Sequence, residues 1–221
     1  LLSVFVVLLA RRADSILRRH DAARRQHETD AWHQAHHDPL TELPNRSLFA
    51  RDLQALLAQG IDRASGALLY VDLDRFKMVN DGFGHQAGDD VLAAAAGRMR
   101  SCLRADDRLY RVGGDEFAIV LAHVRTQADA AAVASRVTHA MAKPIDHRGQ
   151  RFSLGATIGV ALIPRDGDSV DSLVSNANAA MRSAKRDHRG EHVFYSEDMN
   201  ERTHARLGLE AELQRAYDER E

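Results

Sequence analysis

Apolar and polar positions along the chain follow two different periods, and segments of the two kinds alternate from about residue 47 onward. Short apolar runs bounded by glycine or acidic residues predict strands at 67–71, 109–112, 117–122, within 151–163 and at 192–195. Longer stretches of good helix formers predict helices at 47–59, 75–80, 86–103, 127–141 and 169–185. This alternation predicts an α/β fold, in the broad sense that includes α+β, with helices packed on a central sheet.

Two local signals mark where elements begin or turn. Asn45 stands shortly before the predicted helix of 47–59, where its side chain would accept hydrogen bonds from the first helical amides. Gly113 and Gly114 separate two predicted strands, and adjacent glycines accept positive φ. The pair therefore predicts a hairpin with Asp115 and Glu116 at its tip.

The first residues have a different character from the rest of the chain. Residues 1–10 are apolar apart from Ser3, and several arginines follow between 11 and 25. Because a helix needs about 20 apolar residues to cross a bilayer, we expect residues 1–10 to be the end of a truncated transmembrane helix with its basic flank inside. A signal-peptide remnant and an apolar segment buried in the fold are the alternatives. The expected location is the cytoplasmic face of a bacterial inner membrane.

Three further segments follow from the pattern. Residues 11–37 contain no proline or glycine and predict a connecting helix, which could pair with a second copy of the chain. The turn-rich stretch from Asp38 opens a globular domain that we place at 38–196. Residues 197–221 show leucines among charges and predict a linker helix, directed toward a further domain outside this sequence.

Composition limits the function without naming one. The chain has 30 basic and 32 acidic side chains, for a net charge of −2, so we expect no nucleic-acid partner and only local phosphate recognition. The single cysteine, Cys102, excludes an internal disulfide and is interpreted as a small helix residue rather than a reactive thiol. The histidines at 36, 37, 85, 188 and 192 show no metal-ligand spacing and are assigned no chemistry.

Acidic residues gather at the ends of predicted strands. Asp72 and Asp74 close the strand of 67–71, and Asp115 and Glu116 lie at the hairpin tip about forty residues later. Strand ends can meet at one sheet edge, and carboxylates brought together there repel unless a cation lies between them. Hard oxygen ligands of this kind favour Mg²⁺ or Mn²⁺. On spacing alone, four solvated turn residues remain an equal alternative.

Features that bind phosphate lie next to these acids. A helix begins directly after Asp74, and its first amides would attract an anion. Lys77, Lys185 and Arg189 could add positive charge, although each taken singly is more often a surface cation. Their occurrence together with the acidic cluster favours a phosphate site.

Three motifs identify a family that the chain resembles. They are Asp-Leu-Asp-Arg-Phe-Lys-Met-Val-Asn-Asp at 72–81, Gly-His-Gln-Ala-Gly-Asp at 84–89, and Arg-Val-Gly-Gly-Asp-Glu-Phe at 111–117. Together they closely resemble the GGDEF diguanylate cyclases, in that family's order and spacing, from Asp38 through Tyr195. The resemblance implies a mostly antiparallel central sheet flanked by helices, and an enzyme that joins two GTP into cyclic di-GMP.

The resemblance also implies roles for individual residues. Asp72, the Leu73 carbonyl and Asp115 would bind a pair of divalent metals, with Glu116 as a further ligand or as a base. The residues implied for catalysis are Asp72, Asp115, Glu116 and Lys77. Those implied for substrate are Lys185 and Arg189 at phosphate, Asn80 and Asp89 at guanine, and Phe76, Gly113 and Gly114 against the nucleotide. A carboxylate at Asp89 can accept from two guanine donors that adenine does not present together, which favours GTP over ATP.

The sequence departs from the family pattern at two turns. Glu42 stands where the family carries a glycine that often serves positive φ, so the turn that opens the domain is expected to shift. His188 and Gly190 replace a glycine and an asparagine around Arg189, which leaves the placement of Arg189 less defined than that of Lys185. Neither departure touches the implied metal ligands.

A separate motif lies just before the hairpin. Arg104 and Asp107 have the Arg-x-x-Asp spacing of the family's inhibitory product site, where arginine would bind the guanine and phosphates of cyclic di-GMP. An ordinary salt bridge at a helix end is the alternative.

A third reading of the whole chain, an oligomerisation module without chemistry, gives no reason for these polar residues to converge.

Two functional hypotheses therefore remain. The first is a diguanylate cyclase that acts as a homodimer, with GTP as substrate and cyclic di-GMP as product and feedback inhibitor. The second is a GTP-binding regulatory module that controls a neighbouring EAL phosphodiesterase domain, because 197–221 resembles the connector between such domains.

Overall fold

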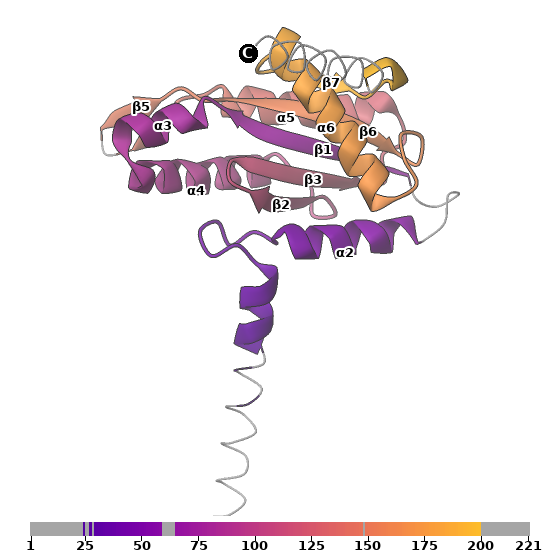
Figure 1. Ribbon diagram of the computed structural model, residues 1–221, viewed down its shortest axis with the longest axis horizontal. Coiled ribbons are helices and arrows are strands. Elements are labelled where there is room, and N and C mark those ends of the chain that lie inside the picture. The colour runs from indigo at the N-terminus through magenta and orange to yellow at the C-terminus, as the bar shows by residue number, and fades with distance from the viewer. Residues whose placement is uncertain (1–23, 25–26, 28, 59–64, 148, 200–221) are drawn as a thin grey trace, which may run out of the picture.

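The computed structural model describes residues 24, 27, 29–58, 65–147 and 149–199. Its helices are α2 (Arg46–Leu57), α3 (Phe76–Phe83), α4 (His85–Ser101), α5 (Gln127–Met141) and α6 (Val170–Asp187). Its strands are β1 (Gly66–Asp74), β2 (Arg108–Gly113), β3 (Glu116–Ala122), β4 (Ile145–His147), β5 (Gln150–Phe152), β6 (Gly155–Ile163) and β7 (His192–Phe194). The predicted alternation of strands and helices is confirmed, with boundaries that differ by a few residues (Figure 1).

The central sheet has the order β2-β3-β1-β6-β7. The pairs β2·β3, β3·β1 and β1·β6 are antiparallel, and β6·β7 is parallel, so the expected mostly antiparallel sheet is confirmed. Strand β1 lies at the centre, and each of its residues from Gly66 to Asp74 is buried. A residue on β1 therefore meets neighbours on both β3 and β6.

Helices cover both faces of this sheet (Figure 1). Because side chains alternate along a strand, Leu69, Val71 and Leu73 of β1 face one layer, where α4 and α5 contribute residues such as Val91 and Val137. Leu68 and Tyr70 face the opposite layer.

The second layer contains α2 and α6. Phe49 and Leu53 of α2, together with Leu173 and Met181 of α6, pack on this face of the sheet. Helix α6 lies very close to β6, since a Cβ added to Gly159 would stand 2.0 Å from the carbonyl oxygen of Ala177. This close packing fixes the helix whose last turn carries Lys185.

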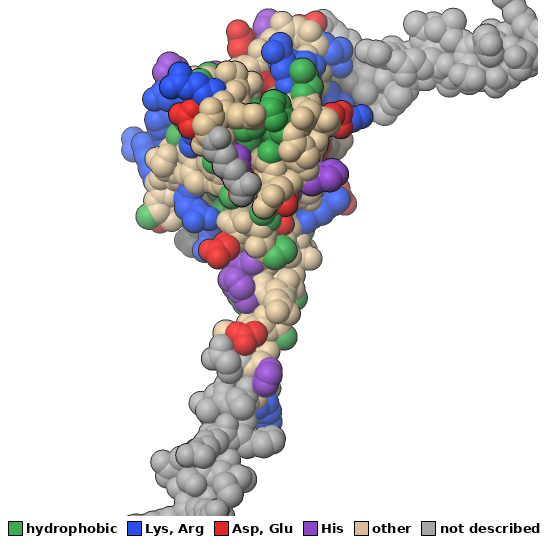
Figure 2. Space-filling model, turned by 90° about the vertical axis from the view of Figure 1, so that its left-hand side faces the viewer, with side chains coloured by type: hydrophobic (Ala, Val, Ile, Leu, Met, Phe, Trp, Pro, Cys, Tyr) green, Lys and Arg blue, Asp and Glu red, His purple; other side chains and the backbone are tan. Residues whose placement is uncertain are grey.

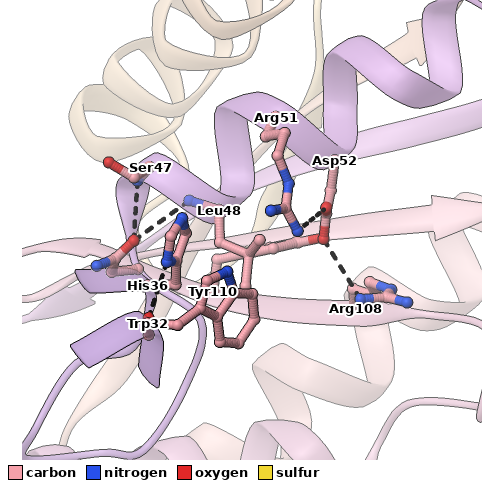
Figure 3. A network of polar contacts seen from close by, with 9 residues as sticks. Trp32, His36, Ser47, Leu48, Arg51, Asp52, Arg108 and Tyr110 are labelled. Atoms are coloured by element: carbon pink, nitrogen blue, oxygen red, sulfur yellow. Dashed lines mark hydrogen bonds and ion pairs between the residues drawn. The ribbon is translucent and has the colours of Figure 1, made fainter. Parts of the chain in front are cut away.

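The start of the domain is tied down by side-chain contacts (Figure 3). Asn45 caps α2 by accepting from the amides of Ser47 and Leu48, as predicted, and its own Nδ2 donates to the carbonyl of Ala35 at 2.8 Å. Residues 29–36 form the last described part of the connecting helix, which projects below α2 in Figure 1. The Arg51 guanidinium lies 5.9 Å from the ring of Trp32, which joins this helix to α2.

A carboxylate links α2 to strand β2 beside these contacts (Figure 3). Asp52 accepts a hydrogen bond from the Tyr110 hydroxyl at 3.0 Å and from Arg108 at 3.3 Å. Tyr110 is fully buried, and burial together with the Asp52 charge raises its pKa. The buried hydroxyl is therefore a firm donor to Asp52.

The turn that opens the domain contains Glu42, where the sequence departs from the family pattern. Glu42 itself adopts the left-handed conformation, with φ of 57°, in a position where a glycine would carry no Cβ penalty. Glu42 is exposed, and its amide donates to the carbonyl of Asp38 at 2.8 Å, so the turn is closed by its backbone.

Glu42→Gly should therefore raise the free energy of unfolding by about 1 kcal/mol, because removing the Cβ strain outweighs the entropy that glycine gains in the unfolded chain. Urea denaturation measures this. Glu42→Ala is the matched control, because alanine removes the same charge and keeps the Cβ. Equal stability of the glycine and alanine variants would contradict the strain argument.

The sequence prediction missed strand β4, while β5 lies at the start of the predicted strand region of 151–163. Strands β4 and β5 form a separate hairpin of three residues each, with Ile145 and Phe152 as its buried members. Cys102 is half-buried at the end of α4, in keeping with its interpretation as a helix residue. The proposed membrane segment 1–10 and nearly all of 197–221 lie outside the described residues. No helix among the described residues is long and apolar enough to cross a bilayer.

Candidate active site

Three acidic residues meet at one end of the central strands. Asp72 of β1 lies directly opposite Glu116 of β3 in the antiparallel register. The amide of Leu73 donates to the carbonyl of Asp115 at 3.2 Å, which holds the hairpin tip against the end of β1. The expectation that the two strand ends share one sheet edge is confirmed for these residues.

The carboxyl group of Asp72 is the buried member of the group. Burial raises the pKa of Asp72 from 3.8 to about 6, the Lys185 ammonium opposes that rise, and the charges of Asp115 and Glu116 add to it. Lys185 forms an ion pair with Oδ1 of Asp72, although this oxygen makes no hydrogen bond of good geometry. Lys185 therefore supplies positive charge at the buried Asp72 carboxylate.

This arrangement fits a divalent cation. A buried carboxylate whose charge is disfavoured, beside two further carboxylates, gains most from a doubly charged partner with oxygen preference. In the described ranges, no three acidic, histidine or cysteine side chains are already drawn around a common point. In this structure the ammonium of Lys185 is the cation paired with Asp72.

Helix α3 begins directly beside these carboxylates. Arg75, the residue before it, has φ of 62°, and no side chain caps the helix at this end. The first amides of α3 therefore point out without a side-chain acceptor, which suits a phosphate group. Lys77 is exposed on the same first turn, while the ring of Phe76 is buried against the core.

Asn80 and Asp89 lie on the two helices of the α3–α4 pair. A Cβ at Gly88 would stand 1.9 Å from the Asn80 Oδ1, so Gly88 is required for the two helices to approach this closely. The same Oδ1 is buried and has no hydrogen-bond partner in the structure, whereas Asp89 is exposed. Both are polar acceptors, and the unpartnered Asn80 oxygen suits a ligand donor.

The loop after α6 is fixed through β6. Thr157 is fully buried, and its hydroxyl donates to the Asp74 carboxylate and accepts from the Gly190 amide at 3.0 Å. Gly190 has φ of 84°, so Gly190 is the residue of this loop that adopts the conformation favoured by glycine. Nε of Arg189 comes to 3.9 Å from Asp74 Oδ1. Asp74 thus anchors this loop, and Arg189 lies near the Asp74 carboxylate.

A brace behind the hairpin was not foreseen from the sequence. Arg111 pairs with Asp38 at 2.9 Å and also donates to the carbonyl of Gly114 at 2.8 Å. The Arg111 pairing and the hydrogen bonds from Thr41 lower the pKa of Asp38 despite its burial. The turn that opens the domain therefore supports the backbone of the hairpin.

Arg104 and Asp107 lie at a separate pocket. The pocket has a volume of about 370 Å³ and is lined by both residues together with Arg125 and Arg136. The Arg104 amide, rather than its guanidinium, donates to the Asp107 carboxylate at 3.0 Å. Arg136 was missed by sequence reasoning because it comes from α5, whose own pattern reads as a plain amphipathic helix.

Charge on the outside of the domain is mixed. Figure 2 shows basic and acidic side chains interspersed over one face of the molecule. This agrees with the nearly balanced count of charged residues and with phosphate binding by local groups.

Comparison with known proteins shows the family of this chain. The family described as "Diguanylate cyclase, GGDEF domain" matches residues 35–191. The chain is 39% identical over 186 residues to the bifunctional diguanylate cyclase/cyclic di-GMP phosphodiesterase MucR of Pseudomonas aeruginosa, covering 84% of this chain and 27% of MucR. It is 45% identical over 160 residues to the diguanylate cyclase TpbB of the same organism, covering 72% of this chain and 37% of TpbB.

A solved structure shares the fold. The GGDEF domain of TpbB superposes with a TM-score of 0.74 at 40% identity, over 76% of this chain and 99% of that one. The chain spans only about a quarter to a third of the length of the curated relatives named above. The family match covers well over half of the chain and includes every strand of the central sheet apart from β7. The chain belongs to the diguanylate cyclase GGDEF-domain family.

Proposed function

We propose that this chain condenses two GTP molecules into cyclic di-GMP, with release of pyrophosphate. The observation that carries the proposal is the meeting of Asp72, Asp115 and Glu116 beside the uncapped start of α3. A phosphate on those amides would lie next to the carboxylates that bind its metal. This is the arrangement that in-line displacement at phosphorus requires.

Asp72, Asp115, Glu116 and the Leu73 carbonyl would hold Mg²⁺ or Mn²⁺. A bound metal pair would acidify the attacking 3′-hydroxyl and neutralise charge on the α-phosphate. Lys185, now paired with Asp72, would bind the phosphates when the carboxylates hold the metal. Lys77 and Arg189 extend the positive field along the pyrophosphate that leaves, while Gly113 and Gly114 let the hairpin backbone lie against the nucleotide.

Asn80 and Asp89 would select guanine. The Asp89 carboxylate accepts from the N1–H and the exocyclic amine of guanine, and the Asn80 oxygen offers a further acceptor. Phe76 is buried beside Gly88 and supports this helix pair from the core. Adenine leaves these acceptors unpaired, so ATP should be a poor substrate.

Activity should require two copies of the chain. Each domain offers one set of phosphate and guanine groups, so two GTP are joined where two domains face each other. The pyrophosphate released per chain per minute should therefore rise with chain concentration and reach a plateau, with two pyrophosphates for each cyclic di-GMP. A continuous pyrophosphate assay over a dilution series measures this, and a rate per chain that stays constant on dilution would contradict the half-site arrangement.

The pocket at Arg104 and Asp107 is proposed as a site for the product. Several arginines around one cavity suit a dinucleotide with two phosphates and two guanines. Binding there would allow cyclic di-GMP to inhibit its own synthesis.

A second function is favoured by the relative that carries both activities. MucR is a bifunctional cyclase and phosphodiesterase of which this chain matches about a quarter, so 38–196 could act as a GTP-binding regulator of a neighbouring EAL domain. In that arrangement 11–37 and 197–221 are the connecting helices, and 1–10 is the tether to the cytoplasmic face of the membrane. GTP binding without product by the dimeric chain would favour this function.

A further inference from the structure

Tyr70 is a buried polar residue on the strand that carries Asp72. Side chains two apart on a strand share a face, so Tyr70 and Asp72 both face the layer of α2 and α6. Tyr70 is opposite Ala118 on β3, and Asp72 is opposite Glu116. Glu116 is therefore the diagonal neighbour of Tyr70, at a spacing that an aromatic side chain can bridge.

The Tyr70 hydroxyl reaches that neighbour. It donates a hydrogen bond to Oε2 of Glu116 at 3.0 Å. Tyr70 is only 7% exposed, so this contact is shielded from solvent. Among the residues that the structure describes, the Tyr70 hydroxyl is the one side-chain partner of the Glu116 carboxylate.

The packing of Tyr70 leaves its ring little freedom. It lies in the apolar layer with Leu68, Phe49 and Met181, which fixes where the hydroxyl points. Glu116, by contrast, is a half-buried side chain with three rotatable bonds at the end of a strand. A rigid donor on a flexible carboxylate selects one orientation of that carboxylate.

We propose that Tyr70 is a positioning residue for Glu116. Its hydroxyl holds Oε2, so that Oε1 is presented toward the edge formed by Asp72 and Asp115. Tyr70 thereby tunes how tightly the carboxylate cluster binds a divalent cation. The inference rests on the metal-dependent cyclase proposed above. It adds to that site a residue that contacts a metal ligand, not the metal, from the layer of α2 and α6.

The chain contains a matched control for this contact. Tyr110 is also a buried tyrosine of the same layer, and its hydroxyl also donates to a carboxylate at 3.0 Å. Its acceptor is Asp52 on α2, in the network of Figure 3, and not one of the clustered carboxylates. Tyr70→Phe and Tyr110→Phe each remove one hydroxyl from an equivalent bond, and only the first removes it from Glu116.

The test measures Mn²⁺ binding without turnover. The electron paramagnetic resonance signal of free Mn²⁺ is titrated against the full chain, and the Mn²⁺ midpoint for pyrophosphate release from GTP is measured in parallel. Tyr70→Phe should raise both Mn²⁺ midpoints about tenfold, as loss of an outer-shell partner does. Tyr110→Phe should leave both within about twofold of the wild type while losing comparable stability in urea.

A double-mutant cycle separates positioning from packing. In a Glu116→Gln background, Tyr70→Phe should produce no further change in the Mn²⁺ midpoint, because the carboxylate it orients is gone. An unchanged midpoint in Tyr70→Phe alone, or an equal rise in Tyr110→Phe, would overturn the proposal. A wild type that binds Mn²⁺ but makes no cyclic di-GMP would refute the cyclase and leave the Tyr70 comparison valid.

Discussion

Replacing Asp115 by asparagine is expected to lower the rate of cyclic di-GMP formation by at least about 100-fold, since even outer-shell partners of a metal contribute 10–100-fold and a direct ligand contributes more. Asparagine preserves the size of the side chain and removes its charge. The hairpin should remain folded, because the backbone carbonyl of Asp115, not its carboxylate, bonds to Leu73. Product formed from GTP and Mg²⁺ is resolved by chromatography.

The matched control for this variant is Asp168→Asn. Asp168 is an exposed acid just before α6, so its replacement makes the same change in total charge far from the hairpin. Its rate should stay within about twofold of the wild type, as surface substitutions usually do. Product formation by Asp115→Asn at the rate of the Asp168→Asn control would remove Asp115 from the metal site.

The second large effect concerns stability and is expected in the opposite direction. Asp72→Asn should make the metal-free chain more stable than the wild type by up to about 3 kcal/mol at pH 8, because a shift in the pKa of Asp72 from 3.8 to about 6 corresponds to roughly two pH units of unfavourable charge burial. Asparagine at 72 carries no charge to bury. Active-site charges commonly lower the stability of the folded protein, so removing one can raise it.

The sign of the pH dependence follows from the same shift. Between about pH 4 and 6 the folded wild type retains a proton on Asp72 that the unfolded chain has released, so the wild type loses stability as pH rises through that window. The advantage of Asp72→Asn should therefore shrink from pH 8 to pH 5 and vanish near pH 4. Urea unfolding in chelator at several pH values measures it. A variant less stable than the wild type at pH 8 would show that the Lys185 pair outweighs the burial cost.

The sequence predicted most of the elements and the meeting of the acidic residues at the ends of β1 and β3. Asp72, Asp115 and Glu116 lie at strand ends in the linear pattern, and the register of β1 with β3 brings them together as the motifs predicted. Asn45 was predicted as a cap from its position alone, and its side chain caps α2. These features depend on local chemistry, which a single sequence records directly.

The features that the sequence did not predict depend on distant partners. Arg111 lies within a recognised motif, yet its partner Asp38 is 73 residues away, and the fold alone brings them together. The hairpin of β4 and β5 is too short to show a period. Tyr70 was taken as part of an apolar strand, although its place two residues before Asp72 already put its hydroxyl on the face of the carboxylates.

The most direct test of the central claim is the identity of the product. The chain is incubated at high concentration with Mg²⁺ and either GTP or ATP. The nucleotides are then separated and identified by mass spectrometry. We expect cyclic di-GMP from GTP, no cyclic dinucleotide from ATP, and loss of product when the metal is chelated. Equal dinucleotide formation from both nucleotides, or product that persists in chelator, would contradict this expectation.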